Sequence, residues 1–347
     1  MDYSGINAKI KAMRGNLLKR ADYDLLSRAD SVESVARMLA EVSTYKNVMS
    51  RTVGVEVHRD LIEQTIILSL SEEFSRIYHF ISDFNIRKFM NAFFLSFELG
   101  IIKTLLCMVF DERNISYTAP ELKMLIGSDM KIDTAALIAS KNVGEFIQNL
   151  NGTELYTMLS DNVTSNSLLF EIEMQIDLYY YMNLWKKQKF LDTKNRRIME
   201  KIIGTEIDLR NIIIVERLKR YYTINDSRIF AYMIPVSYKL NRGQLMRMTA
   251  CRTTDELGRE IDTSPYKKVF ERSTDFERSF KNEMTKLYNR AVLIYPRSLA
   301  YTTGYVFAKQ MELSNIISLL EGIRYKLNVK EIFSYLYFPL EKEALNG

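Results

Sequence analysis

Hydrophobic positions along most of the chain recur with the period of an α-helix. From Ser31 to Met49, apolar residues are spaced three and four apart and form one stripe, made of Val32, Val35, Ala36, Leu39, Val42 and Tyr45. Ser31 directly precedes this run, where a serine hydroxyl can accept a hydrogen bond from a free N–H group of the first turn, so we predict that it is the N-cap. The 347 residues include only 13 Gly and 5 Pro. Turn-rich β folds need more of both, so the pattern predicts an all-α fold.

The same stripe recurs further along the chain. Val143, Phe146, Ile147, Leu150 and Tyr156 stand 111 residues after Val32, Val35, Ala36, Leu39 and Tyr45. A looser third copy contains Leu257, Ile261 and Tyr266 if one residue is deleted before the tyrosine.

A second kind of segment occurs four times, near Asn7, Lys103, Asn211 and Asn315, and is called here a recurring segment. EIDLRNII, which contains Asn211, matches QMELSNII, which contains Asn315, at an offset of 104. Downstream, IFAYMIP (229–235) resembles IFSYLYFP (332–339). FELGIIKTLL (97–106) and INAKIKAM (6–13) are weaker relatives of the same segment.

These copies predict three similar helical domains: 1–100, 101–206, and 207–347, the last with closing C-terminal helices. The alternative is that amphipathic helices fall into partial register by chance, but the ordered succession of copies favours repeats. A period of about 105 residues is too long for the tetratricopeptide or HEAT unit, so tandem small domains are expected.

The most apolar stretch runs from Asn91 to Phe110 and is interrupted by Glu98 and Lys103. Because each charge is costly at a bilayer centre, we predict a buried core helix rather than a membrane span. The N-terminal residues are amphipathic and lack the apolar region of a signal peptide. The sequence thus predicts a chain that is soluble or peripheral to a membrane.

Familiar catalytic motifs are missing. No two glycines are two or five residues apart, which excludes both GxGxxG and a GxxxxGK[ST] phosphate loop. Cys107 and Cys251 form no CxxC pair and indicate a reducing compartment. His58 and His79 are the two histidines, HExxH is absent, and helix-surface or partly buried roles are expected for both. The sequence therefore indicates no catalytic, cofactor-binding or metal-binding residues.

Charged residues suggest surfaces rather than chemistry. The carboxylate pairs Glu72–Glu73 and Glu171/Glu173 lie on charge-rich helical patterns, so we interpret them as solvated faces. The stretch from Lys186 to Arg220 has eleven Lys/Arg and five Asp/Glu, a net of +6. It is either the solvated face of a long helix or a docking patch for an acidic partner.

Three segments resemble the C subunit of V/A-type rotary ATPases, which is similar to the eukaryotic V-ATPase d subunit. They are YSGINAKIKAMRGNLLKRADYDLL at the N-terminus, ADSVESVARMLAEVSTYKNVM with its Thr44–Tyr45 ending, and the C-terminal YVFAKQMELSNIISLLEGIRYKLNVKEIFSYL. In the last, family positions are occupied by Lys309, Glu312, Asn315, Ile316 and Gly322. Ser314 departs from the pattern, since a basic residue is usual there. The resemblance extends from about Tyr3 to Leu336.

The resemblance implies a funnel of three helical domains around a pseudo-threefold axis. It also implies a non-catalytic central-stalk subunit, peripheral on the cytoplasmic face, that couples the rotating shaft to the membrane ion-translocating ring. Its partners would be shaft subunits and the rotor ring, with no cofactor, nucleic acid or small-molecule substrate. We further expect the segments at Asn7, Lys103 and Asn211 to line the interior of the funnel, and the segment at Asn315 to lie beside the first one and close the ring. Partner-binding residues, the direction of ATP chemistry and the choice of H⁺ or Na⁺ stay open.

Three other functions are compatible with parts of the sequence. The first is an all-helical adaptor or scaffold unrelated to rotary motors, which co-purification with a membrane ring would exclude. The second is a helical enzyme without a known motif, although no Glu-x-x-His occurs. The third is a nucleic-acid binder that uses 186–220, whose mark would be binding that weakens steeply with salt.

Overall fold

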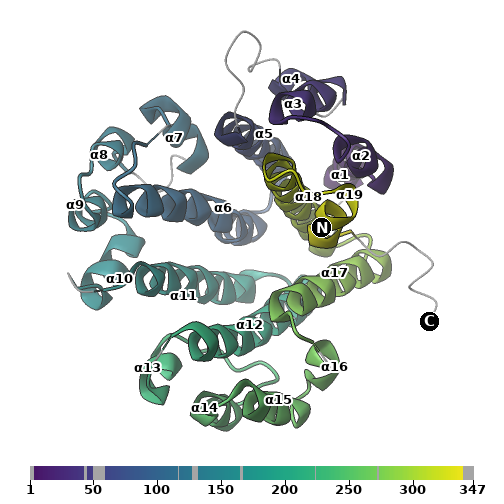
Figure 1. Ribbon diagram of the computed structural model, residues 1–347. Coiled ribbons are helices and arrows are strands. Elements are labelled where there is room, and N and C mark those ends of the chain that lie inside the picture. The colour runs from purple at the N-terminus through teal and green to yellow at the C-terminus, as the bar shows by residue number, and fades with distance from the viewer. Residues whose placement is uncertain are drawn as a thin grey trace. The chain divides into compact units, whose positions relative to one another are not determined.

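The computed structural model describes residues 4–42, 45–49, 59–115, 117–126, 132–164, 167–222, 224–271 and 273–338. All regular elements in these ranges are helices, which confirms the predicted all-α fold (Figure 1). In chain order they are α1 (Ser4–Gly15), α2 (Arg20–Leu26), α3 (Val32–Glu41), α4 (Lys46–Met49), α5 (Arg59–His79), α6 (Phe84–Phe110), α7 (Ala119–Ile126), α8 (Thr134–Ile138), α9 (Val143–Gln148), α10 (Glu154–Asn162), α11 (Leu169–Lys187), η2 (Gln188–Phe190), α12 (Thr193–Tyr221), α13 (Asp226–Ala231), α14 (Arg242–Ala250), α15 (Thr254–Asp262), α16 (Lys267–Phe270), α17 (Phe276–Ile294), α18 (Leu299–Arg324) and α19 (Val329–Tyr335).

The chain divides into two compact units. Unit 1 combines residues 1–82 with residues 281–347, and unit 2 comprises residues 83–280. In unit 1, α18 packs against α1, α3 and α5, so the last recurring segment lies beside the N-terminal helices, as expected (Figure 1). The division into three similar domains, and the funnel they would form, stay predictions.

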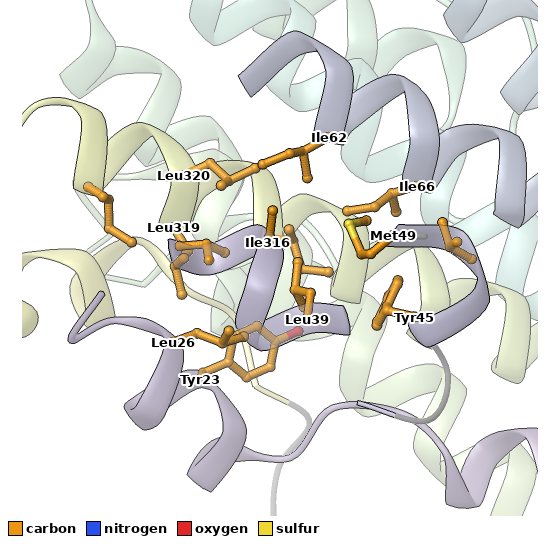
Figure 2. Packing of buried hydrophobic residues seen from close by; sticks show 14 of the residues in the cluster. Tyr23, Leu26, Leu39, Tyr45, Met49, Ile62, Ile66, Ile316, Leu319 and Leu320 are labelled. Carbon is orange, nitrogen blue, oxygen red and sulfur yellow. The ribbon is translucent and has the colours of Figure 1, made fainter. Parts of the chain in front are cut away.

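The core of unit 1 is built from both ends of the chain. Figure 2 shows Tyr23, Leu26 and Leu39 from the N-terminal helices meeting Ile316, Leu319 and Leu320 of α18. The apolar stripe predicted from Val32 to Tyr45 faces this core, although α3 ends at Glu41 and Tyr45 lies beyond it. Val35, Ala36, Leu39 and Tyr45 are buried, and Val32 and Val42 pack against them partly buried. Burial of apolar area is the main stabilising term in folding, so α18 and the first helices stabilise each other.

Unit 2 is organised around three long helices. α6 packs along α11, α11 continues through η2 into α12, and the short helices α13 to α15 cover α12. A close approach occurs at Gly204 on α12, where a Cβ atom would lie 2.4 Å from Cγ of Tyr238. Only glycine leaves room for the Tyr238 side chain so near the helix backbone.

The repeated stripes begin with the same local structure. Ser31 is the N-cap of α3, as predicted, and accepts a hydrogen bond from the N–H of Ser34. Asn142 caps α9 and Thr253 caps α15 in the same way, each stabilising the free N–H groups of a first turn. The three caps are 111 residues apart, so this local feature repeats at a constant spacing.

Helix α6 is the one helix, among the described residues, that is long and apolar enough to cross a membrane. Half of its most apolar window is buried inside the protein, and core helices of soluble proteins can be equally long and apolar. Lys103 of α6 forms an ion pair with Asp177 of α11, with 2.5 Å between Nζ and Oδ1. These contacts support the prediction of a core helix.

Candidate functional site: two buried polar anchors

Three charged side chains are buried together in unit 1. They are Lys309 and Glu312 of α18 and Glu73 of α5, with exposed fractions of 2%, 4% and 8%. Lys309 Nζ lies 2.7 Å from Glu312 Oε1 and 3.7 Å from Glu73 Oε1. A buried charge is tolerated only with a partner, and here one ammonium group compensates two carboxylates.

Neutral donors complete the hydrogen bonding of both carboxylates. The Tyr45 hydroxyl donates to Glu312 Oε1 and the Leu18 N–H donates to Glu312 Oε2, each at 2.5 Å. The Tyr305 hydroxyl donates to Glu73 Oε2 at 2.7 Å. Burial, together with the charge of Glu312, raises the pKa of Tyr45 well above its ordinary value, so this phenol stays a donor.

Asn315, one turn after Glu312, holds a loop of the same unit. Its Nδ2 donates to the carbonyl of Tyr337 at 2.7 Å, and its Oδ1 accepts from the N–H of Tyr337 at 2.8 Å. The amide thus replaces a backbone partner for this residue, which follows α19. We call Lys309, Glu312, Asn315 and their partners the α18 anchor.

A second anchor occurs on α12 in unit 2, at the matching positions of the repeat. Asp208 is fully buried, and its Oδ2 accepts from the N–H groups of Lys239 at 2.7 Å and Leu240 at 3.1 Å. The Tyr266 hydroxyl donates to the same oxygen at 2.8 Å. Burial raises the pKa of Asp208, although these three donors oppose the shift.

Asn211 completes the α12 anchor in the same way as Asn315. Its Nδ2 donates to the carbonyl of Ile234 at 3.0 Å, and its Oδ1 accepts from the N–H of Ile234 at 2.8 Å. Ile234 and Tyr337 are themselves 103 residues apart, within the two matching loop segments. The likeness found between these sequences therefore corresponds to one shared hydrogen-bond pattern.

The other two recurring segments differ. Asn7 of α1 donates through Nδ2 to the carbonyl of Pro296 at 2.8 Å, a single hydrogen bond to a loop. Lys103, at the asparagine position on α6, pairs with Asp177 instead. The hypothesis that these segments line a funnel stays untested, but the side chains of Asn211 and Asn315 are buried within their own units.

The interpretation of two carboxylates as parts of solvated faces is wrong. Glu73 is buried in the α18 anchor, and Glu171 of α11 is buried against Arg228 and Tyr232. Burial alone would raise the pKa of Glu171, but the Tyr232 hydroxyl, the Leu168 N–H and the Arg228 guanidinium lower it below its ordinary value. Helical periodicity shows which residues share a face, not which element covers that face. The sequence signal that could have pointed to the buried carboxylates is the pair of tyrosines aligned in the stripes, Tyr45 and Tyr266, which bind Glu312 and Asp208.

Residues considered for chemistry lie apart from both anchors. Cys107 and Cys251 are free and half-buried, His79 is exposed, and His58 lies outside the described residues, as does Thr44. Within the described ranges, no group of three or more His, Cys, Asp or Glu side chains is placed to hold a metal ion. The anchors themselves join helices to distant segments through buried hydrogen bonds, which stabilises packing.

This architecture defines a class: an all-helical protein with repeated segments, whose buried polar side chains connect parts of the chain far apart in sequence. The profile of the ATP synthase (C/AC39) subunit family matches residues 6–335. The chain therefore belongs to the ATP synthase (C/AC39) subunit family.

Curated relatives agree with this assignment over most of their length. The C subunit of the A-type ATP synthase of Methanosphaera stadtmanae is 23% identical, over 90% of this chain and 82% of the relative. The protein of the same name from Methanocaldococcus jannaschii is 21% identical, over 96% and 86%. That of Methanosarcina barkeri is 24% identical, over 90% and 87%.

Proposed function

We propose that this chain is a non-catalytic central-stalk subunit that couples the rotating shaft of a rotary ATPase to its membrane ion-translocating ring. The observation that carries the proposal is the family match over residues 6–335, together with relatives that are named as the C subunit of A-type ATP synthases. Its partners would be the shaft subunits and the rotor ring, with the chain peripheral on the cytoplasmic face.

The packing suits a part that transmits torque. A coupling element has to resist deformation, and interiors packed with buried side chains are stiff. Both anchors add hydrogen bonds that fix a loop residue to a long helix: Ile234 to α12 and Tyr337 to α18. The absence of a phosphate loop from the sequence supports a role outside nucleotide hydrolysis.

The test is reconstitution of the complex with and without this chain. Without it, we expect ATP hydrolysis by the soluble sector to persist while ATP-driven ion uptake into membrane vesicles is lost. Adding the purified chain should restore uptake. Ion transport at full rate without the chain would contradict the proposal, and so would ATP hydrolysis by the chain alone.

The alternative is an all-helical adaptor or scaffold that has the family fold but takes no part in a rotary motor. Purification of the endogenous protein from membranes separates the two. Co-purification with ring and shaft subunits in fixed stoichiometry supports the coupling role, whereas recovery without any motor subunit supports the adaptor.

A further inference from the structure

One part of unit 2 is strongly cationic and belongs to neither anchor. Residues 186–201, called here the basic corner, contain seven Lys/Arg and two Asp/Glu, a net of +5. The formal net charge of the whole chain is also +5, so the remaining residues balance one another. All of the chain's excess positive charge is therefore concentrated in sixteen residues.

The basic corner is where α11 ends, η2 turns and α12 begins. Lys187 is half-buried, and the other six cations are exposed. The exposed ones are Lys186, Lys189, Lys194, Arg196, Arg197 and Lys201. Among the described residues, none of these seven side chains forms an ion pair, whereas the basic residues further along α12 all do. Those pairs are Arg210 and Arg217 with Glu277, Lys219 with Asp226, and Arg220 with Glu216.

Exposed aromatic rings accompany these cations. Phe190 lies at the turn between the helices and is 48% exposed, and Phe84 at the start of α6 is 68% exposed. The Lys88 ammonium lies 4.3 Å from the Phe84 ring centroid and 5.7 Å from that of Phe190. The corner thus presents apolar rings surrounded by flexible basic side chains.

We propose that the basic corner docks onto a membrane surface that carries anionic lipids. Clusters of four to eight basic residues bind anionic headgroups, and an aromatic ring between them can enter the headgroup layer. Five of the seven cations are lysines, which suit dispersed phosphates, whereas a binding site on an acidic protein favours the fixed fork of arginine. This inference rests on the proposed peripheral membrane placement but not on the coupling role.

Vesicle co-sedimentation of the full-length chain tests the proposal. We expect binding to vesicles of mixed phosphatidylglycerol and phosphatidylcholine, weakened by added salt, and no binding to phosphatidylcholine alone. Each basic side chain near an anionic surface contributes about fivefold to partitioning. The triple variant Lys189→Gln, Lys194→Gln, Arg197→Gln should therefore bind on the order of 100-fold more weakly.

A matched control removes the same charge elsewhere in unit 2. Arg252, Lys267 and Lys268 are exposed and lie outside the corner, so the triple variant Arg252→Gln, Lys267→Gln, Lys268→Gln should bind like the parent chain. Phe190→Ser should weaken binding severalfold without changing its salt dependence. Circular dichroism confirms that each variant is folded before binding is scored.

Three results would overturn the proposal. The first is equal binding of the parent chain to neutral and anionic vesicles, and the second is an equal loss of vesicle binding in both triple variants. The third is that the variant Lys189→Gln, Lys194→Gln, Arg197→Gln loses binding to an immobilised acidic polypeptide but keeps its binding to vesicles. The last result would assign the corner to a protein partner. Because the vesicle assay contains no other subunit, its failure leaves the coupling role intact, and loss of ion uptake in the reconstituted complex tests that role separately.

Discussion

The α18 anchor of unit 1 and the α12 anchor of unit 2 perform the same task with different chemistry. In both, a helix carboxylate accepts from a tyrosine hydroxyl, Tyr45 for Glu312 and Tyr266 for Asp208, and an asparagine follows three residues later. Glu312 is neutralised by Lys309, whereas the position that corresponds to Lys309 in unit 2 is the buried Thr205. One carboxylate is therefore held by a cation and the other by dipoles alone.

The two anchors share the contact to the loop and differ in how the carboxylate is compensated. The hydrogen bonds that fix the loop, at Tyr337 and at Ile234, are present in both units. The compensation of the acid varies with its surroundings: Glu312 shares Lys309 with a second buried carboxylate, Glu73, whereas Asp208 has backbone N–H groups within reach. Buried polar groups need partners, but the identity of the partner is free to change.

Removing the cation of the α18 anchor should cause the largest loss of stability and the largest difference between the two anchors. Lys309→Met leaves Glu312 and Glu73 buried without an opposite charge, and we expect a loss of about 3–5 kcal/mol in the free energy of unfolding. Thr205→Val, at the matching position in unit 2, should lose about 1 kcal/mol because the side-chain hydrogen bond between Thr205 and Tyr266 is removed. Urea unfolding, with hydrogen exchange to locate the loss, measures both. Equal losses would mean that the buried ion pair has no special role.

The asparagine substitutions should differ less. Asn211→Ala and Asn315→Ala each leave an N–H and a C=O group without their partner, at about 1–3 kcal/mol for each unsatisfied group. Because Ile234 is buried and Tyr337 is half-buried, water can replace the lost partner more easily in unit 1. We expect the larger loss for Asn211→Ala. A larger loss at Asn315 would indicate that exposure does not govern this contact.

A smaller, stabilising effect is expected at the ends of α6 and α18. Glu112 and Lys326 both adopt positive φ, 54° and 55°. Arg113 and Leu327, the residues that follow, donate to the carbonyls of Met108 and Gly322. This left-handed C-cap favours glycine, so Lys326→Gly and Glu112→Gly should each stabilise their unit by about 0.5–1 kcal/mol. Thermal unfolding of the glycine variants tests this, with Glu112→Ala and Lys326→Ala as controls. Alanine keeps the backbone strain of a positive φ, so it should give no gain in stability.

The smallest effect is a change of slope with pH. Burial raises the pKa of Asp208 above the ordinary 3.8, so between the two values the folded chain holds a proton that the unfolded chain has released. The free energy of unfolding therefore falls as pH rises through this window. Asp208→Asn lacks this contribution, so its stability relative to the parent chain should rise with pH there and level off above it. Stability curves of both proteins from pH 3 upward measure the difference, and a difference that falls with pH would show that the donors lower this pKa instead.

Several features could be predicted from the sequence because they depend on residues that are close together along the chain. The N-cap at Ser31 and the apolar stripe with Val35 and Leu39 depend on residues within one helix, and the structure has them as predicted. The match of Asp208 and Asn211 to Glu312 and Asn315 also came from the sequence, since a shared contact restricts the same side chains in each copy. The positions of the tyrosines followed from the stripes, but not their carboxylate partners.

The partners themselves depend on contacts between distant residues. The pattern around Glu73 is rich in charge and predicts a solvated side chain, yet α18 covers it and brings Lys309 and Tyr305 to it from more than 200 residues away. Periodicity within one helix contains no information on which other helix will pack there. The sequence by itself thus determined the all-helical fold, the N-cap at Ser31 and the repeated positions. Only the tertiary structure decided which charges are buried, because burial and pairing arise when segments distant in sequence pack into one core.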